Sequence, residues 1–246
     1  MRLLTYLTLM TTLVACGLPE IFTAEVPNPL ERYRYSCSPI DSLIVDRHLP
    51  ALDSLYGEQL EADAYRDKIL AALSFYPELR GVRIRLVRKP LRTSMAARPL
   101  RFSARRHRRT YALLVDDTQY ANKPADFRRA SYSAQVGCFI HELGHISYYE
   151  RHSGNRIVRD GIAYVTNQRF KNEFERTADR FAIRNGGGYY VYLYRTFTFE
   201  EANLPPAYLA FKRRNYNTQE AVLEKHLSYL EAEGLLEGTE CGSRGD

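Results

Sequence analysis

The sequence predicts an α+β fold that is mainly helical, with a small β-sheet preceding one central helix. Apolar residues recur at helical spacing in five segments, namely 41–56, 59–75, 134–150, 169–185 and 217–233. Residues 82–88 alternate apolar and basic side chains, and residues 110–115 are strongly apolar, so both segments predict strands. At 246 residues with 45% hydrophobic content, the chain is long enough to bury one sizeable core. We therefore expect residues 41–246 to form a single domain.

The N-terminus predicts an exported protein. Residues 1–15 form a secretory signal, in which Arg2 precedes an apolar run too short to span a membrane. Its end, Leu13-Val14-Ala15-Cys16, resembles the lipobox of bacterial lipoproteins, which implies cleavage before Cys16 and lipid attachment to its thiol. The alternative is an ordinary signal peptide followed by a plain cysteine. Residues 16–40 contain four prolines and predict a tether to the membrane.

These features place the protein in the bacterial cell envelope, lipid-anchored and facing outside the cytoplasm. Gly17 after the lipidated cysteine favours the outer membrane if the cell has one. In an oxidising compartment Cys37 and Cys241, near the two ends of the mature chain, could form a disulfide, although sequence alone leaves the pairing open.

The central helix carries the segment His141-Glu142-Leu143-Gly144-His145, an HExxH motif. Two histidines four residues apart lie on one helix face, so both imidazoles can reach a single Zn²⁺. Glu142 lies beside the first ligand and can act as a general base towards a water that the metal activates. The alternative is a helix with two ordinary surface or core histidines. Cys138, one turn earlier, is interpreted as a small buried residue rather than a thiol that acts at the metal.

A catalytic zinc takes three protein ligands, so a third must be found. The extended pattern HExxHxxGxxH is excluded, because Tyr148 and Arg151 stand where Gly and His are required. Glu175 and Asp179 are four residues apart on a following helix and lie on one face of it. Glu173 is a rival ligand, but it faces elsewhere on that helix.

The acidic pair has a second interpretation as ordinary surface carboxylates that pair with Arg176 or Arg180. However, HExxH followed by Glu175, Ala178 and Asp179, an ExxAD pattern, resembles the gluzincin class of zinc metallopeptidases. The resemblance covers roughly residues 130–185 and implies a zincin-like fold. It implies one zinc ion on His141, His145 and Glu175, with Asp179 accepting a hydrogen bond from a ligand histidine.

The same resemblance implies hydrolysis of peptide bonds in a polypeptide substrate, with Glu142 as general base. An edge strand near the active-site helix would pair with extended substrate. Gluzincins often add a Tyr or His that stabilises the oxyanion. The candidates here are Tyr189, Tyr190, Tyr192, Tyr194 and His226. Residues 190–246 match no particular gluzincin family.

Residues 101–109, at the end of a predicted loop over 90–109, contain five arginines. Such a cluster attracts anions, and lipid head groups or an acidic substrate suit an envelope protein; a solvated loop without a partner is the alternative. No nucleic-acid-binding motif accompanies the cluster, so no nucleic acid partner is expected. A second hypothesis for the whole chain is a non-catalytic, zinc-containing envelope lipoprotein that binds a partner or an anionic surface. The presence of Glu142 favours the enzyme.

Overall fold

The structure is a computed structural model of the chain, and it describes residues 27–91, 93–100, 108–117, 126–236 and 241. The expected signal peptide, the lipidation residue Cys16 and residues 101–107 of the arginine cluster lie outside the described residues. Within the described part, the mixed α and β composition expected from the sequence is confirmed. No described helix is long and apolar enough to cross a membrane.

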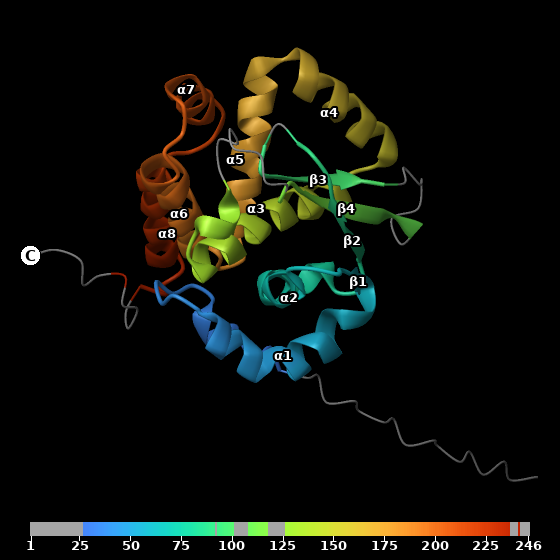
Figure 1. Ribbon diagram of the computed structural model, residues 1–246, viewed down its shortest axis with the longest axis vertical. Helices are drawn as coiled ribbons and strands as arrows, with labels where there is room; N and C mark the ends of the chain where they lie inside the picture. Colours follow the sequence, from blue (N-terminus) through green and yellow to red (C-terminus); the bar gives the residue numbers. More distant parts are fainter. Residues whose placement is uncertain (1–26, 92, 101–107, 118–125, 237–240, 242–246) are drawn as a thin grey trace, which may run out of the picture.

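The helices make up most of the described chain. They are α1 (Ser42–Tyr56), α2 (Arg66–Leu73), α3 (Tyr132–Glu150), α4 (Gly154–Thr166), α5 (Gln168–Arg184), α6 (Gly188–Thr196), α7 (Pro206–Asn215) and α8 (Gln219–Ala232). A π-helical turn at Phe197–Glu201 extends α6. The C-terminal helices α6, α7 and α8 lie on one side of α3, and the sheet lies on the other side (Figure 1).

The sheet has four strands in the order β1-β2-β4-β3. They are β1 (Leu60–Glu61), β2 (Arg83–Arg88), β3 (Met95–Pro99) and β4 (Thr110–Val115). β1, β2 and β4 run parallel, whereas β3 runs antiparallel to β4 at the edge. The prediction of strands near 82–88 and 110–115 is confirmed. The prediction of a continuous loop over 90–109 is wrong, because residues 95–99 pair with β4 and form the strand β3. These residues lack the alternation of apolar and polar side chains by which a strand is predicted.

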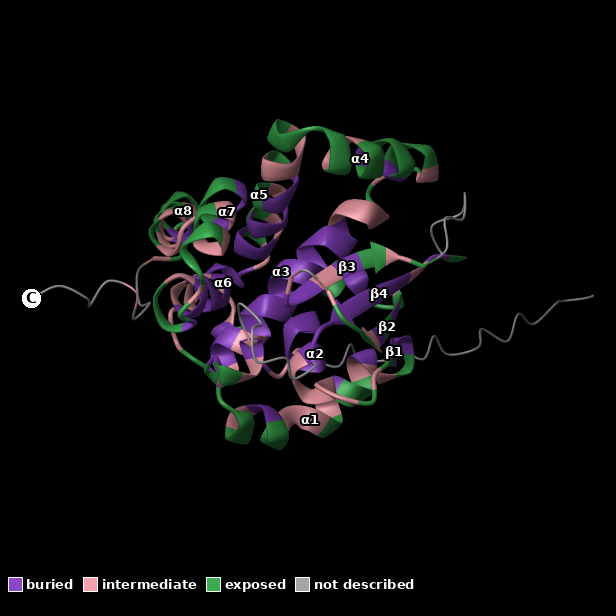
Figure 2. Ribbon diagram, turned by 45° about the horizontal axis from the view of Figure 1, so that its top comes forward, coloured by how far each residue is buried: buried purple, intermediate pink, exposed green. Residues whose placement is uncertain are grey.

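Helix α3 is the centre of the fold. The side chain of Ser131 accepts a hydrogen bond from the backbone N–H of Ala134 and caps its first turn. The helix contacts α2, α5, α6 and β3, and most of its residues are buried, as its colour in Figure 2 shows. A Cβ added at Gly144 would lie 2.6 Å from the carbonyl oxygen of Ala178, so glycine permits the close approach of α3 and α5.

Arg109, the last residue of the arginine cluster, supports the other end of α3. It is 2% exposed and donates hydrogen bonds of 2.8 Å to the carbonyl oxygens of Tyr149 and His152. A cation is favourable at a helix C-terminus, where carbonyl groups lack intrahelical partners. This arginine therefore has a structural role, while Arg108 beside it is exposed.

Two helices begin later than the sequence predicts, and a third was not predicted. α2 begins at Arg66 rather than near residue 59, because Tyr65 adopts a left-handed conformation with φ 55°. α8 begins at Gln219 rather than at residue 217, and the side chain of Thr218 caps it by accepting a hydrogen bond from the Ala221 N–H. The stretch after α3 lies outside the five helical segments predicted from the sequence, but it forms α4, with Ser153 as its N-cap.

The aromatic segment after residue 188, which is outside the helices and strands predicted from the sequence, is helical. An irregular stretch at residues 202–205 separates this helical segment from α7, which begins at Pro206 because proline is tolerated in the first turn of a helix. Lys212 on this helix is buried.

The described part of the expected tether packs on the domain. Leu30 is 0% and Ile40 2% exposed, and both belong to the hydrophobic core. The hydroxyl of Tyr190 donates to the carbonyl oxygen of Ser38 at 2.9 Å. Cys37 and Cys241 form a disulfide. Residues 27–40 are thus held at both the core and the C-terminal end.

Candidate metal centre

Helices α3 and α5 bring three potential metal ligands together. His141 and His145 project from successive turns of α3, and Glu175 projects from the facing side of α5. The Glu175 Oε2 atom lies 3.3 Å from Nε2 of each histidine. All three residues are buried, and their ligand atoms lie within 4.8 Å of one another. This buried group could hold a metal ion.

Asp179 orients the first histidine. Its Oδ1 lies 2.8 Å from Nδ1 of His141, and its side chain is 0% exposed. A proton on Nδ1 leaves Nε2 of His141, the atom near Glu175, with its lone pair available for a metal. Burial alone would raise the pKa of Asp179, but Arg195 and His141 lower it to about 2. Asp179 is therefore a permanent acceptor at this position.

Asp179 is itself held by two donors from the C-terminal part of the chain. Arg195 on α6 donates from NH2 to Oδ1 at 3.0 Å, and Asn217 donates to Oδ2 at 2.8 Å. Lys225 on α8 donates to the side-chain oxygen of Asn217 at 2.8 Å. A chain of hydrogen bonds thus connects α8 to the histidine.

Glu175 is positioned by a residue of α4. The hydroxyl of Tyr164 donates to Oε1 of Glu175 at 2.5 Å, so the other oxygen, Oε2, is directed at the histidines. Burial would raise the pKa of Glu175, but His145 and His141 hold it well below its usual range. The carboxylate is thus ionised and ready to bind a cation.

His141 is charged when no cation is bound. Burial and Arg195 act to lower the pKa of His141, yet Asp179 and Glu175 raise it to about 9. A metal ligand must be a neutral imidazole, so binding of a metal releases this proton. The three side chains therefore fit a cation. When it binds, its positive charge takes the place of the His141 proton beside the Glu175 carboxylate.

Aromatic rings enclose both histidines. The ring of His145 stacks on Phe174 with 4.9 Å between ring centroids, and the ring of Tyr216 lies 5.9 Å from that of His141. Nδ1 of His145 has no hydrogen-bond partner among the described residues. The second histidine is thus held by packing, whereas the first is held by hydrogen bonds.

The remaining residues predicted on these helices are also placed. Glu142 follows His141 on α3 and is 6% exposed. Glu173 is exposed on α5 and pairs with Arg180 at 2.8 Å, away from the histidines. Cys138 is buried against Met95, and burial raises the pKa of its thiol to about 12. The thiol is therefore neutral and packs in the core.

None of the five predicted oxyanion candidates contacts the three ligands within the described part of the chain. Tyr190 hydrogen-bonds to Ser38, Tyr189 stacks on Tyr192, and Tyr194 is buried in the hydrophobic core. His226 packs against Gly188. Tyr164 and Tyr216 do contact the ligands, Glu175 and His141 respectively.

The sequence patterns did not identify four residues of the site, Arg195, Asn217, Tyr164 and Tyr216. One sequence feature pointed to Arg195, which is the single charged residue of the aromatic helix Gly188–Thr196. A lone charge on an otherwise apolar helix needs a partner when it is buried. For the other three residues no comparable feature exists.

Comparisons of the chain with models of protein families, with curated protein sequences and with solved structures found no match.

Proposed function

We propose that this chain is a zinc-dependent metallopeptidase with a zincin-like fold. The observation that supports the proposal most strongly is the convergence of His141 Nε2 and His145 Nε2 on Glu175 Oε2, each at 3.3 Å. Two imidazoles and one carboxylate are a donor set of catalytic zinc sites, and zinc favours such nitrogen and oxygen ligands. Asp179 behind His141 supplies the supporting acceptor that ligand histidines usually have.

Each residue then has a role in hydrolysis. A zinc ion held by His141, His145 and Glu175 would polarise the scissile carbonyl and lower the pKa of a water molecule. Glu142, beside His141, takes a proton from the attacking water and delivers it to the leaving amine. Tyr164 and Asp179 keep Glu175 and His141 in the orientation that binding requires.

The edge strand β3 suits a polypeptide substrate. It pairs with β4 on one side, and it contacts α3, which carries the histidines. An extended peptide can add to such an edge through backbone hydrogen bonds. The substrate backbone would then run alongside the helix that bears Glu142.

The location of the enzyme is part of the same proposal. The lipobox-like sequence before Cys16 supports a lipid anchor in the bacterial cell envelope, and the arginine cluster at 101–109 supports contact with an anionic surface. Intact-mass measurement of membrane-extracted protein tests the anchor, since a diacylglyceryl cysteine adds the mass of its acyl chains. A mature protein that retains residues 1–15 would contradict it.

Metal analysis combined with Glu142→Gln tests the function. We expect about one zinc per chain in the wild type and in the variant, with proteolysis of an unfolded protein lost only in the variant. Glu173→Gln, an exposed carboxylate on α5, is the matched control and should keep both properties. Mature wild type without stoichiometric zinc would refute the proposal. Wild type that binds zinc but cleaves no peptide in a diverse library would favour the second hypothesis, a non-catalytic lipoprotein.

A further inference from the structure

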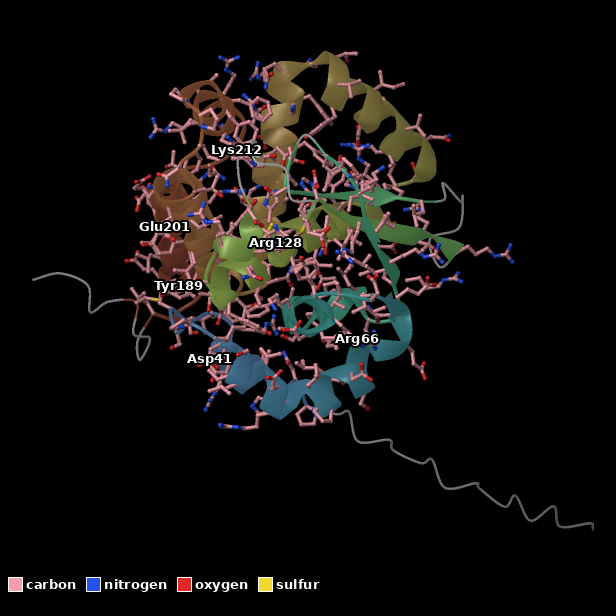
Figure 3. All side chains as sticks on the ribbon, viewed as in Figure 1. Asp41, Arg66, Arg128, Tyr189, Glu201 and Lys212 are labelled. Atoms are coloured by element: carbon pink, nitrogen blue, oxygen red, sulfur yellow. A yellow bond between two sulfur atoms is a disulfide. The ribbon has the colours of Figure 1, made fainter. Side chains whose placement is uncertain are left out.

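Lys212 on α7 is a buried lysine without an anionic partner among the described residues. It is 4% exposed, and it lies between α7 and α5 (Figure 3). Its ammonium forms no hydrogen bond or ion pair with a described residue. Instead, Nζ lies 4.4 Å from the ring centre of Tyr216 and 5.6 Å from that of Tyr208. A buried, unpaired ammonium group is costly, so its retention needs an explanation.

This ammonium is one aromatic ring away from the metal centre. The ring of Tyr216 contacts Lys212 and also lies 5.9 Å from the ring of His141. Burial and the charge of Arg195 lower the pKa of Lys212 to about 8, while Glu175 and Glu142 oppose this shift. Lys212 is therefore cationic near neutral pH and close to both carboxylates of the proposed active site.

The buried carboxylates of the site do not require Lys212 as a counter-charge. Asp179 already has a direct ion pair with Arg195 at 3.0 Å. Glu175 already contacts both histidines. Lys212 contacts neither carboxylate directly, so its three N–H donors are available to another acceptor. The two tyrosine rings stabilise its charge but take up no N–H donor in a conventional hydrogen bond.

We propose that Lys212 binds a carboxylate of the substrate, so that this site acts on peptides with a negative charge near the scissile bond. The inference rests on the proposed peptidase function and specifies its substrate class. Two groups share the required chemistry, the free C-terminal carboxylate of a peptide and the side chain of an internal Asp or Glu. An ammonium and a carboxylate form a charge-assisted hydrogen bond that is stronger in a desolvated pocket.

Kinetics with matched peptides test the inference. One quenched fluorogenic sequence is prepared with a free C-terminus, with an amidated C-terminus, and with an amidated C-terminus plus an internal Glu. We expect wild type to prefer one of the charged peptides. Lys212→Met should lower kcat/KM on that peptide by about 10- to 100-fold, mainly through KM, and should leave kcat/KM on the neutral peptide unchanged. Lys212→Arg should restore part of the preference.

Lys68→Met is the matched control, because Lys68 lies on the ring of Tyr132 at 4.5 Å, on α2. This variant should change kcat/KM on neither the charged nor the neutral peptide. Equal losses on charged and neutral peptides in Lys212→Met, with zinc content and circular dichroism unchanged, would overturn the inference. So would the absence of any effect.

A binding measurement separates this inference from the proposed function. Isothermal titration of Glu142→Gln protein with the same peptides reports affinity without turnover. Charge-dependent binding that Lys212→Met abolishes would support the anchor even if wild type proved inactive. Charge-independent binding would refute the anchor even if wild type proved to be a zinc peptidase.

Discussion

Arg195 donates a hydrogen bond of 3.0 Å to Asp179, and both side chains are almost completely buried, at 1% and 0% exposed. NH2 of Arg195 also lies 3.3 Å from Nδ1 of His141. The arginine therefore shares an acceptor with the histidine and counterbalances the negative charge that Asp179 brings to the metal centre. Arg195 also stacks over the ring of Tyr216 at 4.7 Å, which connects the pair to the wall of the site.

Removal of the Arg195 charge should damage both stability and metal binding. Arg195→Met leaves Asp179 as a buried carboxylate without its cation, so we expect a loss of about 3–5 kcal/mol in the free energy of unfolding. Zinc affinity should fall by about 10- to 100-fold, because the orientation of His141 depends on Asp179. Denaturant titration and zinc competition with a chromophoric chelator measure the two effects.

Arg180→Met is the control. Because Arg180 belongs to an exposed ion pair, this change should lower the free energy of unfolding by less than about 1 kcal/mol. Equal behaviour of the two variants would contradict the role assigned to Arg195.

The close packing of α3 against α5 at Gly144 should determine both the stability of the fold and the zinc affinity of the metal centre. In Gly144→Ala the new Cβ would lie 2.6 Å from the carbonyl oxygen of Ala178 and 3.0 Å from its Cα. The helices must separate, so we expect a loss of about 1–3 kcal/mol or more, together with weaker zinc binding. Gly161→Ala on α4 is the control, since nothing lies within 4 Å of its added Cβ. It should stabilise the protein by about 0.5–1 kcal/mol. Zinc binding at wild-type affinity in Gly144→Ala would show that the ligands do not depend on this contact.

His226 should make the fold sensitive to mild acid. It is 0% exposed, and burial lowers its pKa from 6.5 to about 4. Between these values the unfolded chain binds more protons than the folded chain, so stability falls as the pH drops from about 6.5 towards 4. The contribution of this residue amounts to about 3 kcal/mol over that window.

Urea denaturation at several pH values, with a chelator present throughout, measures this dependence. His226→Leu removes the titrating group, and neither ring nitrogen has a described hydrogen-bond partner to lose. The variant should therefore resemble wild type near pH 7 and be the more stable of the two near pH 4. Parallel pH curves for the two proteins would rule out His226 as the source of the acid sensitivity.

The metal ligands could be predicted because each helix carries its own part of the pattern. His141 and His145 are four residues apart, as are Glu175 and Asp179, and helical spacing alone places each pair on one face. The approach of the two pairs depends on packing, and the sequence indicated it only through small residues such as Ala178. The structure brings the pairs together with Ala178 against Gly144.

Asn217 and Tyr164 could not be predicted, because no spacing along the chain relates them to the residues that they contact. Asn217 is 38 residues from Asp179 along the chain, and nothing in local periodicity relates the two. Helix α4 was missed because Gly154 and Gly161 lower helix propensity. Its Asp160 accepts a hydrogen bond from Tyr148, and its Tyr164 donates one to Glu175, so tertiary contacts hold this helix in place.

The disulfide between Cys37 and Cys241 joins residues 204 positions apart, and it turns nearly the whole described chain into a covalent ring. A single backbone cut anywhere between these cysteines opens the ring but releases no fragment. The helices that carry the histidines and the glutamate would stay in one molecule, and a nicked chain would keep its full mass until a reductant is added. In surroundings rich in proteases, separation of the chain into fragments would require two cuts, or one cut together with reduction of the disulfide.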